Sequence, residues 1–328
     1  MGKTNVVIVG GLGYVGIRLA EELRQQKDIN LICIDLDLFN LDLVTSFYDE
    51  MIIGDICEEL SINRIKEVAK EGKVVVVWCC DIDTPEFYET EWGIKYSQKM
   101  LECLKKLIEL KIRLIKITDT ANHAGVYCDY LNEVKILCSC CSYKDVLLIN
   151  TGEVFGFSSS MRFDTFINRY IFDGIMKSTI SVDNWYKICR FTFIDDIIDR
   201  IINVIVKDDN IKEIGIGNEV NVNWATMNIV TCAFLLSFIN NQIDPEEPIN
   251  PSFNVKEEVS IKEIDGKTIC MNDKFYNTLY SYFRQVYDLF KKEQVDVKDL
   301  LDLRYRRRDS VMLMCRIPNL IKNFAKLA

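Results

Sequence analysis

The feature that most constrains this fold is a glycine-rich turn close to the start of the chain. Val6 to Val9 is an apolar run, which predicts a buried strand, and the glycines Gly10, Gly13 and Gly16 follow it. From Tyr14 onward apolar side chains recur at helical spacing, so the turn joins a strand to a helix. Such a turn brings backbone amides close to a pyrophosphate. The sequence therefore predicts a dinucleotide-binding site.

An acidic residue at the end of the second predicted strand completes this site. Asp35 ends the apolar segment that begins at Leu31, and it lies about 20 residues beyond Gly16, where a ribose-binding carboxylate is expected. A carboxylate at this place accepts hydrogen bonds from the ribose hydroxyls and repels a 2′-phosphate. We therefore predict NAD as the cofactor, with NADP disfavoured.

The first 150 residues alternate between apolar strand patterns and amphipathic helix patterns. This alternation is typical of a parallel sheet covered by helices on both faces. The expected strands are Asn5–Val9, Leu31–Asp35, Glu50–Ile53, Val74–Trp78, Arg113–Ile117 and Val146–Asn150, and the expected helices are Tyr14–Gln26, Thr90–Leu110 and Asn132–Ser142. The fold class is thus α/β, a doubly wound parallel (Rossmann) sheet.

The second half of the chain is less regular and predicts a smaller, mixed α/β lobe. A loop is expected over Asn240–Pro251, because this stretch carries three of the five prolines. The other expected elements are strands at Thr179–Val182 and Glu213–Ile216 and helices at Ile194–Val206, Trp224–Ile239, Asn277–Lys292 and Ile317–Lys326. We expect a Rossmann domain over residues 1–156 and a substrate-binding lobe over residues 157–328, interleaved at the sheet edge.

The composition limits the classes of partner. The net charge of −9 argues against a nucleic acid, which favours a basic protein face. The longest apolar run, Val74 to Cys80, is far shorter than the roughly 20 residues that a membrane-spanning helix needs. The N-terminus also lacks the long apolar segment of a signal peptide. We expect a soluble, cytoplasmic protein that binds neither nucleic acid nor membrane.

The 13 cysteines are many, but several, such as Cys33, Cys79, Cys80 and Cys103, lie in or next to predicted strands and helices, where reduced thiols pack as small apolar groups. Cys138, Cys140 and Cys141 form a cluster that could suggest a metal site. Zinc sites usually combine two pairs of cysteine or histidine ligands, and His123 is the single histidine. We therefore predict free thiols and no metal.

The glycine spacing, Gly-x-x-Gly-x-x-Gly, resembles that of the extended short-chain dehydrogenase/reductases. The chain is similar to their NAD-dependent epimerase/dehydratase branch, which acts on nucleotide sugars, and the likeness extends over most of its length. Gly54-Asp55-Ile56 resembles the family's segment that contacts adenine, and Cys79 and Cys80 follow the strand beside the cofactor. The resemblance implies that the cofactor is bound by Gly10, Leu12, Gly13, Tyr14, Val15, Gly16, Asp35, Asp55, Ile56, Cys79, Cys80 and Lys135.

The same resemblance implies residues on the substrate side. Thr118-Asp119-Thr120 resembles the family's serine-rich run, which makes Thr120 the counterpart of the catalytic Ser/Thr. The turn containing Glu153 is similar to one that faces the substrate, and Arg190 lies ahead of an Asp-Asp segment typical of the family. Arg306 would bind the substrate diphosphate, for which an arginine fork is suited. The alternative for the RYRRRD stretch is a solvated basic segment.

The family's catalytic Tyr-x-x-x-Lys motif is altered. Lys135 matches the lysine, which holds the nicotinamide ribose, but the residue four places before it is Leu131. Tyr130 is one place away, which on a helix turns the side chain by about 100°, and Tyr127 is expected to precede the helix. Either tyrosine could act as the acid/base if the first turn is irregular. His123 could relay a proton, or it could be structural.

Three functions remain open from the sequence. The first is an NAD-dependent epimerase, dehydratase or reductase that transfers a hydride between a nucleotide sugar and the nicotinamide, with Thr120, Tyr130 and Lys135 as its catalytic residues. The second is a catalytically inactive relative that binds NAD and acts through protein partners. The third is a reductase for a non-sugar alcohol or ketone. Relatives often dimerise through two helices, so we expect a homodimer built on the helices from Thr90 and Asn132.

Overall fold

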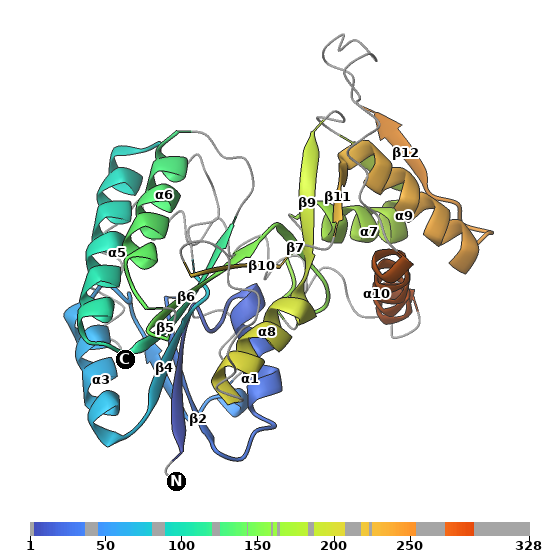
Figure 1. Ribbon diagram of the computed structural model, residues 1–328. Coiled ribbons are helices and arrows are strands. Elements are labelled where there is room, and N and C mark those ends of the chain that lie inside the picture. The colour runs from blue at the N-terminus through green and yellow to red at the C-terminus, as the bar shows by residue number, and fades with distance from the viewer. Residues whose placement is uncertain are drawn as a thin grey trace.

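The computed structural model describes residues 3–36, 45–80, 89–119, 125–142, 144–158, 160–162, 165–182, 187–206, 218–222, 225–253 and 273–291. These residues form a large sheet flanked by helices and a smaller part that lies beside its carboxyl edge (Figure 1). The predicted α/β class with a doubly wound parallel sheet and a mixed C-terminal lobe is confirmed.

The large sheet has seven strands in the order β10-β6-β5-β4-β1-β2-β3, and every neighbouring pair is parallel. Its direction of winding changes between β1 and β4, which is where ligands bind in sheets of this kind. The strands are β1 (Thr4–Val9), β2 (Ile29–Asp35), β3 (Glu50–Ile53), β4 (Val74–Trp78), β5 (Arg113–Asp119), β6 (Val146–Thr151) and β10 (Glu219–Val222).

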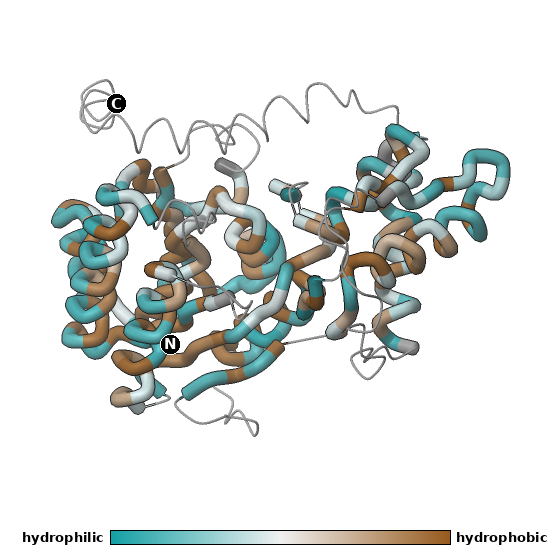
Figure 2. Tube along the Cα trace, turned by 90° about the horizontal axis from the view of Figure 1, so that it is seen from above, coloured by the Kyte–Doolittle hydropathy of each residue, from teal (hydrophilic) through white to brown (hydrophobic). Residues whose placement is uncertain are grey.

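Helices cover both faces of this sheet (Figure 1). Alternate residues of β1 point to opposite sides, so Val6 and Ile8 belong to one apolar core while Val7 and Val9 belong to the other. The first core is closed by α1 (Tyr14–Leu23) and α8 (Ile194–Val206), and the second by α3 (Glu59–Glu71), α5 (Glu91–Glu109) and α6 (Val126–Ser139). Hydrophilic and hydrophobic residues alternate along these helices, as expected for amphipathic helices (Figure 2).

The smaller part contains two short sheets and three helices. A three-stranded sheet combines β7 (Glu153–Phe155), β9 (Ile188–Phe193) and β11 (Ala225–Asn228), and β8 (Thr179–Val182) pairs with β12 (Asn250–Phe253). The helices are α7 (Phe166–Lys177), α9 (Ile229–Ile243) and α10 (Asp273–Lys291). The chain crosses between the parts three times, since β7 lies in the small sheet, the later β10 lies in the large one, and β11 lies in the small sheet again.

Several predicted boundaries were wrong. Helix α1 ends at Leu23 rather than Gln26, and α6 begins at Val126, so it includes Tyr127. The expected helix from Trp224 is instead strand β11 followed by α9, because one continuous apolar stretch serves both elements. The expected proline-rich loop is shorter, since β12 includes Pro251, which an edge strand tolerates. The strand expected at Glu213–Ile216 and the helix at Ile317–Lys326 lie outside the described residues.

A buried hydrogen-bond network joins the two parts at the glycine turn. The Tyr14 hydroxyl donates to the Gly156 carbonyl (2.5 Å) and accepts from Asn168 Nδ2 (3.2 Å). Asn168, which is 0% exposed, in turn accepts from the Tyr282 hydroxyl of α10 (2.7 Å). The first residue of α1 is therefore fixed to α7 and α10 of the smaller part.

No helix within the ranges described above combines the length and the apolar character that crossing a bilayer requires.

Candidate cofactor site and active site

The glycine turn has a shape that only glycine can adopt at two of its positions. Gly10 has φ of +79°, in the left-handed region, and a Cβ added there would lie 2.8 Å from the Cys80 Cβ. A Cβ added at Gly16 would lie 2.2 Å from the Gly10 carbonyl oxygen. Helix α1 thus packs directly against the turn, as the predicted dinucleotide site requires.

The turn presents donors for an anion. Gly13 precedes α1 and makes no side-chain cap. The amides of Val15 and Gly16 lie in the first helical turn, where no carbonyl of the helix can accept from them. The positive end of the helix dipole lies at the same place. These groups fit the pyrophosphate of a dinucleotide.

Asp35 lies at the end of β2 and is half-buried. Its Oδ2 accepts a hydrogen bond from the Leu12 amide (2.8 Å), so the carboxylate and the glycine turn hold each other in position. The carboxylate therefore stands beside the turn, where the ribose of a bound dinucleotide is expected.

The loop after β3 is fixed at the same edge of the sheet. Asp55 is buried, and its Oδ1 accepts from the Cys57 amide (2.9 Å) and the Tyr96 hydroxyl (3.1 Å). Lys99 donates to Oδ2 at 3.1 Å. Burial, together with the charge of Asp55, raises the pKa of Tyr96 well above its ordinary value. Tyr96 and Lys99 could not be recognised from the sequence, because they meet Asp55 only in the tertiary structure.

The loop after β4 lies against the glycine turn. The Cys79 amide donates to the Val9 carbonyl (2.8 Å), and Cys79 and Cys80 are both half-buried. Burial raises the pKa of the Cys79 thiol to about 12. Ile56 and Tyr14, also predicted at the site, are buried beside the same edge. These residues line the edge of the sheet beside the glycine turn, and the raised pKa keeps the Cys79 thiol protonated and unreactive at neutral pH.

Helix α6 is regular from Val126 to Ser139, and the structure does not bring Tyr130 and Lys135 onto one face. Their separation of five positions turns the two side chains about 140° apart. Tyr127 and Tyr130 are both buried, with stacked rings 6.4 Å apart, and Leu131 is buried with them. Lys135 is half-buried. The irregular first turn that could have brought one of the tyrosines into the motif position is absent from this helix.

Among the residues predicted on the substrate side, Glu153 makes a structural contact: its Oε1 accepts a hydrogen bond from the Phe166 amide at the start of α7 (2.8 Å). Arg190 is exposed on the neighbouring strand β9. Gly152 packs so tightly against the Arg190 carbonyl that an added Cβ would lie 2.3 Å from it. Thr120, His123 and Arg306 lie outside the described residues.

The cysteine cluster at the end of α6 contains both buried and exposed thiols. Cys138 is buried and its pKa is raised to about 12 by burial, whereas Cys140 is exposed. The Cys141 thiol donates to the Leu137 carbonyl (3.5 Å). Each cysteine in the described ranges is a free thiol, and those ranges hold no group of three or more metal-ligating side chains.

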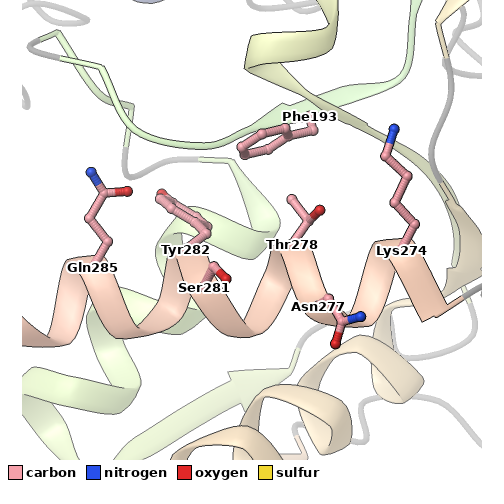
Figure 3. Close-up of a pocket in the computed structure, with 7 residues that line it drawn as sticks. All are labelled: Phe193, Lys274, Asn277, Thr278, Ser281, Tyr282 and Gln285. Atoms are coloured by element: carbon pink, nitrogen blue, oxygen red, sulfur yellow. The ribbon is translucent and has the colours of Figure 1, made fainter.

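An open groove of about 570 Å³ lies between α10 and the end of β9. Lys274, Thr278, Tyr282 and Gln285 project from one face of α10 toward the segment that carries Phe193 (Figure 3). Asn277 and Ser281 complete the lining. This groove could not be predicted from the sequence, since it forms only where two distant segments pack together.

Asp196, in the first turn of α8, gives a pH-dependent prediction. Desolvation raises its pKa to about 6, although the nearby Lys274 opposes the shift. The folded state therefore binds the proton more tightly than the unfolded state, so stability falls as the pH rises from about 4 to above 6. We expect Asp196→Asn to stabilise the protein at pH 7.5 by roughly 1–2 kcal/mol and to have no such effect at pH 4. Urea unfolding at both pH values measures this.

The control for this prediction is Asp129→Asn, which alters an exposed aspartate in the first turn of α6. It should change stability equally little at both pH values. An Asp196→Asn effect of the same size at pH 4 and pH 7.5 would contradict the assignment.

This chain is similar to known proteins in its structure but not in its sequence. No protein-family model matches the chain, and no curated protein matches it. The UDP-glucuronic acid 4-epimerase of Bacillus cereus, solved with UDP-glucuronic acid and NAD, is 16% identical with a TM-score of 0.60 over 86% of this chain and 100% of that chain.

Two further similar structures are those of another epimerase and of a dehydrogenase. The UDP-glucose 4-epimerase of Thermotoga maritima, solved with UDP-glucose, is 12% identical with a TM-score of 0.59 over 86% of this chain and 99% of that one. The L-threonine dehydrogenase of Phytophthora infestans is 10% identical with a TM-score of 0.61, over 88% and 99%. The chain therefore has the fold of these two UDP-sugar 4-epimerases, which the L-threonine dehydrogenase shares.

Proposed function

We propose that this protein is an NAD-dependent enzyme that acts on a nucleotide sugar by hydride transfer. The observation that carries the proposal is the glycine turn, where Gly10 is left-handed, Gly16 leaves no room for a Cβ beside the Gly10 carbonyl, and Asp35 accepts from the Leu12 amide. This arrangement suits a dinucleotide pyrophosphate at the amides of the turn and a ribose at Asp35. When bound, NAD supplies the hydride acceptor.

The substrate class is supported by the two epimerases of the same fold, which were solved with UDP-sugars. In this chain, Thr120 would position the substrate, while Arg190 and Arg306 would contact its anionic groups and Glu153 would keep the adjoining turn in place. Tyr127 or Tyr130 of α6 would exchange the proton with the sugar hydroxyl, since both lie on the face of α6 that packs toward the sheet. The sequence motif assigns the ribose-binding lysine to Lys135.

A second function is favoured by one specific observation. Leu131, an apolar and buried residue, stands one helical turn before Lys135, in the place of the family's tyrosine. A protein that binds NAD without turnover and acts through partners would tolerate this substitution. A non-sugar substrate is the third candidate, since the L-threonine dehydrogenase shares the fold.

One set of measurements separates these functions. Calorimetric titration with NAD and with ADP tests the cofactor site. Turnover is tested by the absorbance of reduced cofactor while the protein is incubated with UDP-sugars or with small hydroxy compounds such as threonine. Turnover of a UDP-sugar that Tyr127→Phe or Tyr130→Phe abolishes would support the first function. NAD binding without turnover of any substrate would favour the second. Failure to bind either nucleotide would refute all three.

Cofactor preference gives a further prediction. Asp35→Asn keeps an acceptor for the Leu12 amide but removes the negative charge. We expect the preference for NAD over NADP to fall by about ten-fold or more, because the carboxylate no longer repels the 2′-phosphate. Titration of both cofactors into both proteins measures the ratio.

The matched control is Asp49→Asn, because Asp49 also accepts from a backbone amide, that of Leu31, but lies at the amino end of β3. It should leave the ratio unchanged. A wild-type protein that prefers NADP would contradict the role of Asp35.

We also propose a cytoplasmic homodimer that associates through α5 and α6. Ile136 of α6 is 66% exposed and Ile94 of α5 is 37% exposed, which is the apolar surface expected at such an interface. Light scattering of the purified protein, compared with an Ile136→Lys variant, tests the association.

A further inference from the structure

The glycine turn carries one glycine, Gly11, outside the three positions that the dinucleotide pattern requires. Its backbone is not left-handed, so its conformation does not explain why a glycine stands there. A Cβ added at Gly11 would lie 2.6 Å from the Cys33 Sγ and 2.8 Å from the Tyr48 hydroxyl oxygen. Two buried side chains therefore occupy the space that a side chain of residue 11 would need.

Tyr48 lies between η1, a 3₁₀-helix (Thr45–Phe47), and β3, and only 6% of its surface is exposed. Its hydroxyl donates to the Gly11 carbonyl oxygen (2.6 Å) and lies 3.5 Å from the Gly16 carbonyl oxygen of α1. Burial raises the pKa of Tyr48 well above its ordinary value, and the charge of Asp35 adds to the rise. Tyr48 therefore keeps its proton and donates it in a hydrogen bond to the backbone of the turn.

The peptide unit between Gly11 and Leu12 is held on both sides. Its carbonyl oxygen accepts from Tyr48 at 2.6 Å, and its N–H, which belongs to Leu12, donates to Asp35 Oδ2 at 2.8 Å. Because a trans peptide unit is planar, a hydrogen bond that fixes the carbonyl also fixes the direction of the N–H on the opposite side. One rigid group thus connects the Tyr48 hydroxyl to the Asp35 carboxylate.

We propose that Tyr48 is a positioning residue that sets the preference of this protein for NAD over NADP. By fixing the peptide between Gly11 and Leu12, its hydroxyl holds the Asp35 carboxylate where it accepts from the ribose hydroxyls and where its charge repels a 2′-phosphate. A phenylalanine ring would fill the same buried space, so packing does not account for the hydroxyl. This inference rests on the proposed function, and it adds a residue from outside the sequence motif to the choice of cofactor.

The test measures the affinities of NAD and NADP for Tyr48→Phe by calorimetric titration. We expect the ratio of the two dissociation constants to move against NAD by about three- to ten-fold, which corresponds to the net free energy of one hydrogen bond. Tyr96→Phe is the matched control, because the Tyr96 hydroxyl donates to Asp55 after β3 and not to the glycine turn. This control should change the affinities of both cofactors to the same extent and leave their ratio as in the wild type.

A second arm of the test combines Tyr48→Phe with Asp35→Asn. Since Tyr48 acts on the ratio through the charge of Asp35, the double variant should have the ratio of Asp35→Asn alone, within about two-fold. Additive changes of the ratio would overturn the proposal. So would an equal loss of affinity for NAD and NADP in Tyr48→Phe, because that is the result expected if Tyr48 only stabilises the fold.

Gly11→Ala serves as a second variant if Tyr48→Phe does not fold. Its Cβ would displace the Tyr48 hydroxyl and the Cys33 thiol, which are side-chain atoms, so the ratio should move in the same direction. An unchanged ratio in this variant would contradict the proposal. A wild-type protein that binds NAD and NADP equally well would refute this inference alone, whereas a wild-type protein that binds neither would refute the proposed function with it.

Discussion

Gly16→Ala should abolish NAD binding, with a loss of affinity of at least about 100-fold. The added Cβ would lie 2.2 Å from the Gly10 carbonyl oxygen and 2.8 Å from the Gly11 Cα, and both are backbone atoms that cannot turn away. The turn and the first residues of α1 must therefore separate, which displaces the amides that face the pyrophosphate. Overpacking of this kind should also lower stability by about 1–3 kcal/mol. Calorimetric titration and thermal unfolding measure the two effects.

Gly72→Ala is the matched control, because its Cβ would meet the nearest atom, the Lys3 carbonyl oxygen, at an ordinary 3.7 Å. It should bind NAD like the wild type. Retention of wild-type affinity by Gly16→Ala would show that the cofactor is bound elsewhere.

Asn168→Ala should lower the free energy of unfolding by about 3–5 kcal/mol, a large effect for one substitution. The Asn168 side chain accepts from the Tyr282 hydroxyl and the Gly156 amide, and it donates to the Arg162 carbonyl and the Tyr14 hydroxyl. Because the site is fully buried, water cannot replace these contacts. Urea unfolding followed by circular dichroism measures the loss.

Asn132→Ala, at an exposed position on α6, controls for the change of residue type and should alter stability by less than about 0.5 kcal/mol. The paired variants Tyr282→Phe and Tyr276→Phe extend the comparison. Tyr282 donates into the buried network, whereas Tyr276 donates to Gln242 at the surface. Equal stability of these two variants would mean that the network contributes little.

The cofactor half of the site was predictable because its parts are local. Strand β4 is a run of apolar residues found at its predicted bounds, Val74–Trp78. Gly10, Gly16 and Asp35 occupy fixed positions relative to strands that their own sequences define. Backbone geometry near a pyrophosphate leaves so few solutions that the sequence pattern is specific.

Other elements escaped prediction for physical reasons. Helix α3 buries only a narrow apolar stripe that includes Ile62, Ile65 and Val68. The rest of its segment is highly charged, so the periodicity of apolar residues in the sequence is weak. Helix α6 begins earlier than expected because Gly125, with φ of +74°, starts it directly after the short connection. Lys116 could not be recognised as buried, because a single lysine in a strand pattern normally faces water. Its environment becomes evident only when β4, β5 and α6 are assembled.

The placement of β10 has a consequence for how this chain can be divided. Strand β6 is fully buried, and its outer edge pairs with β10, which comes from the second half of the sequence. A recombinant fragment that stops at Gly156 would leave the backbone of β6 unpaired and would self-associate along that edge. Domain exchange with a relative would therefore have to carry an edge strand along with the substrate lobe, because no single cut in the sequence separates the large sheet from the smaller part.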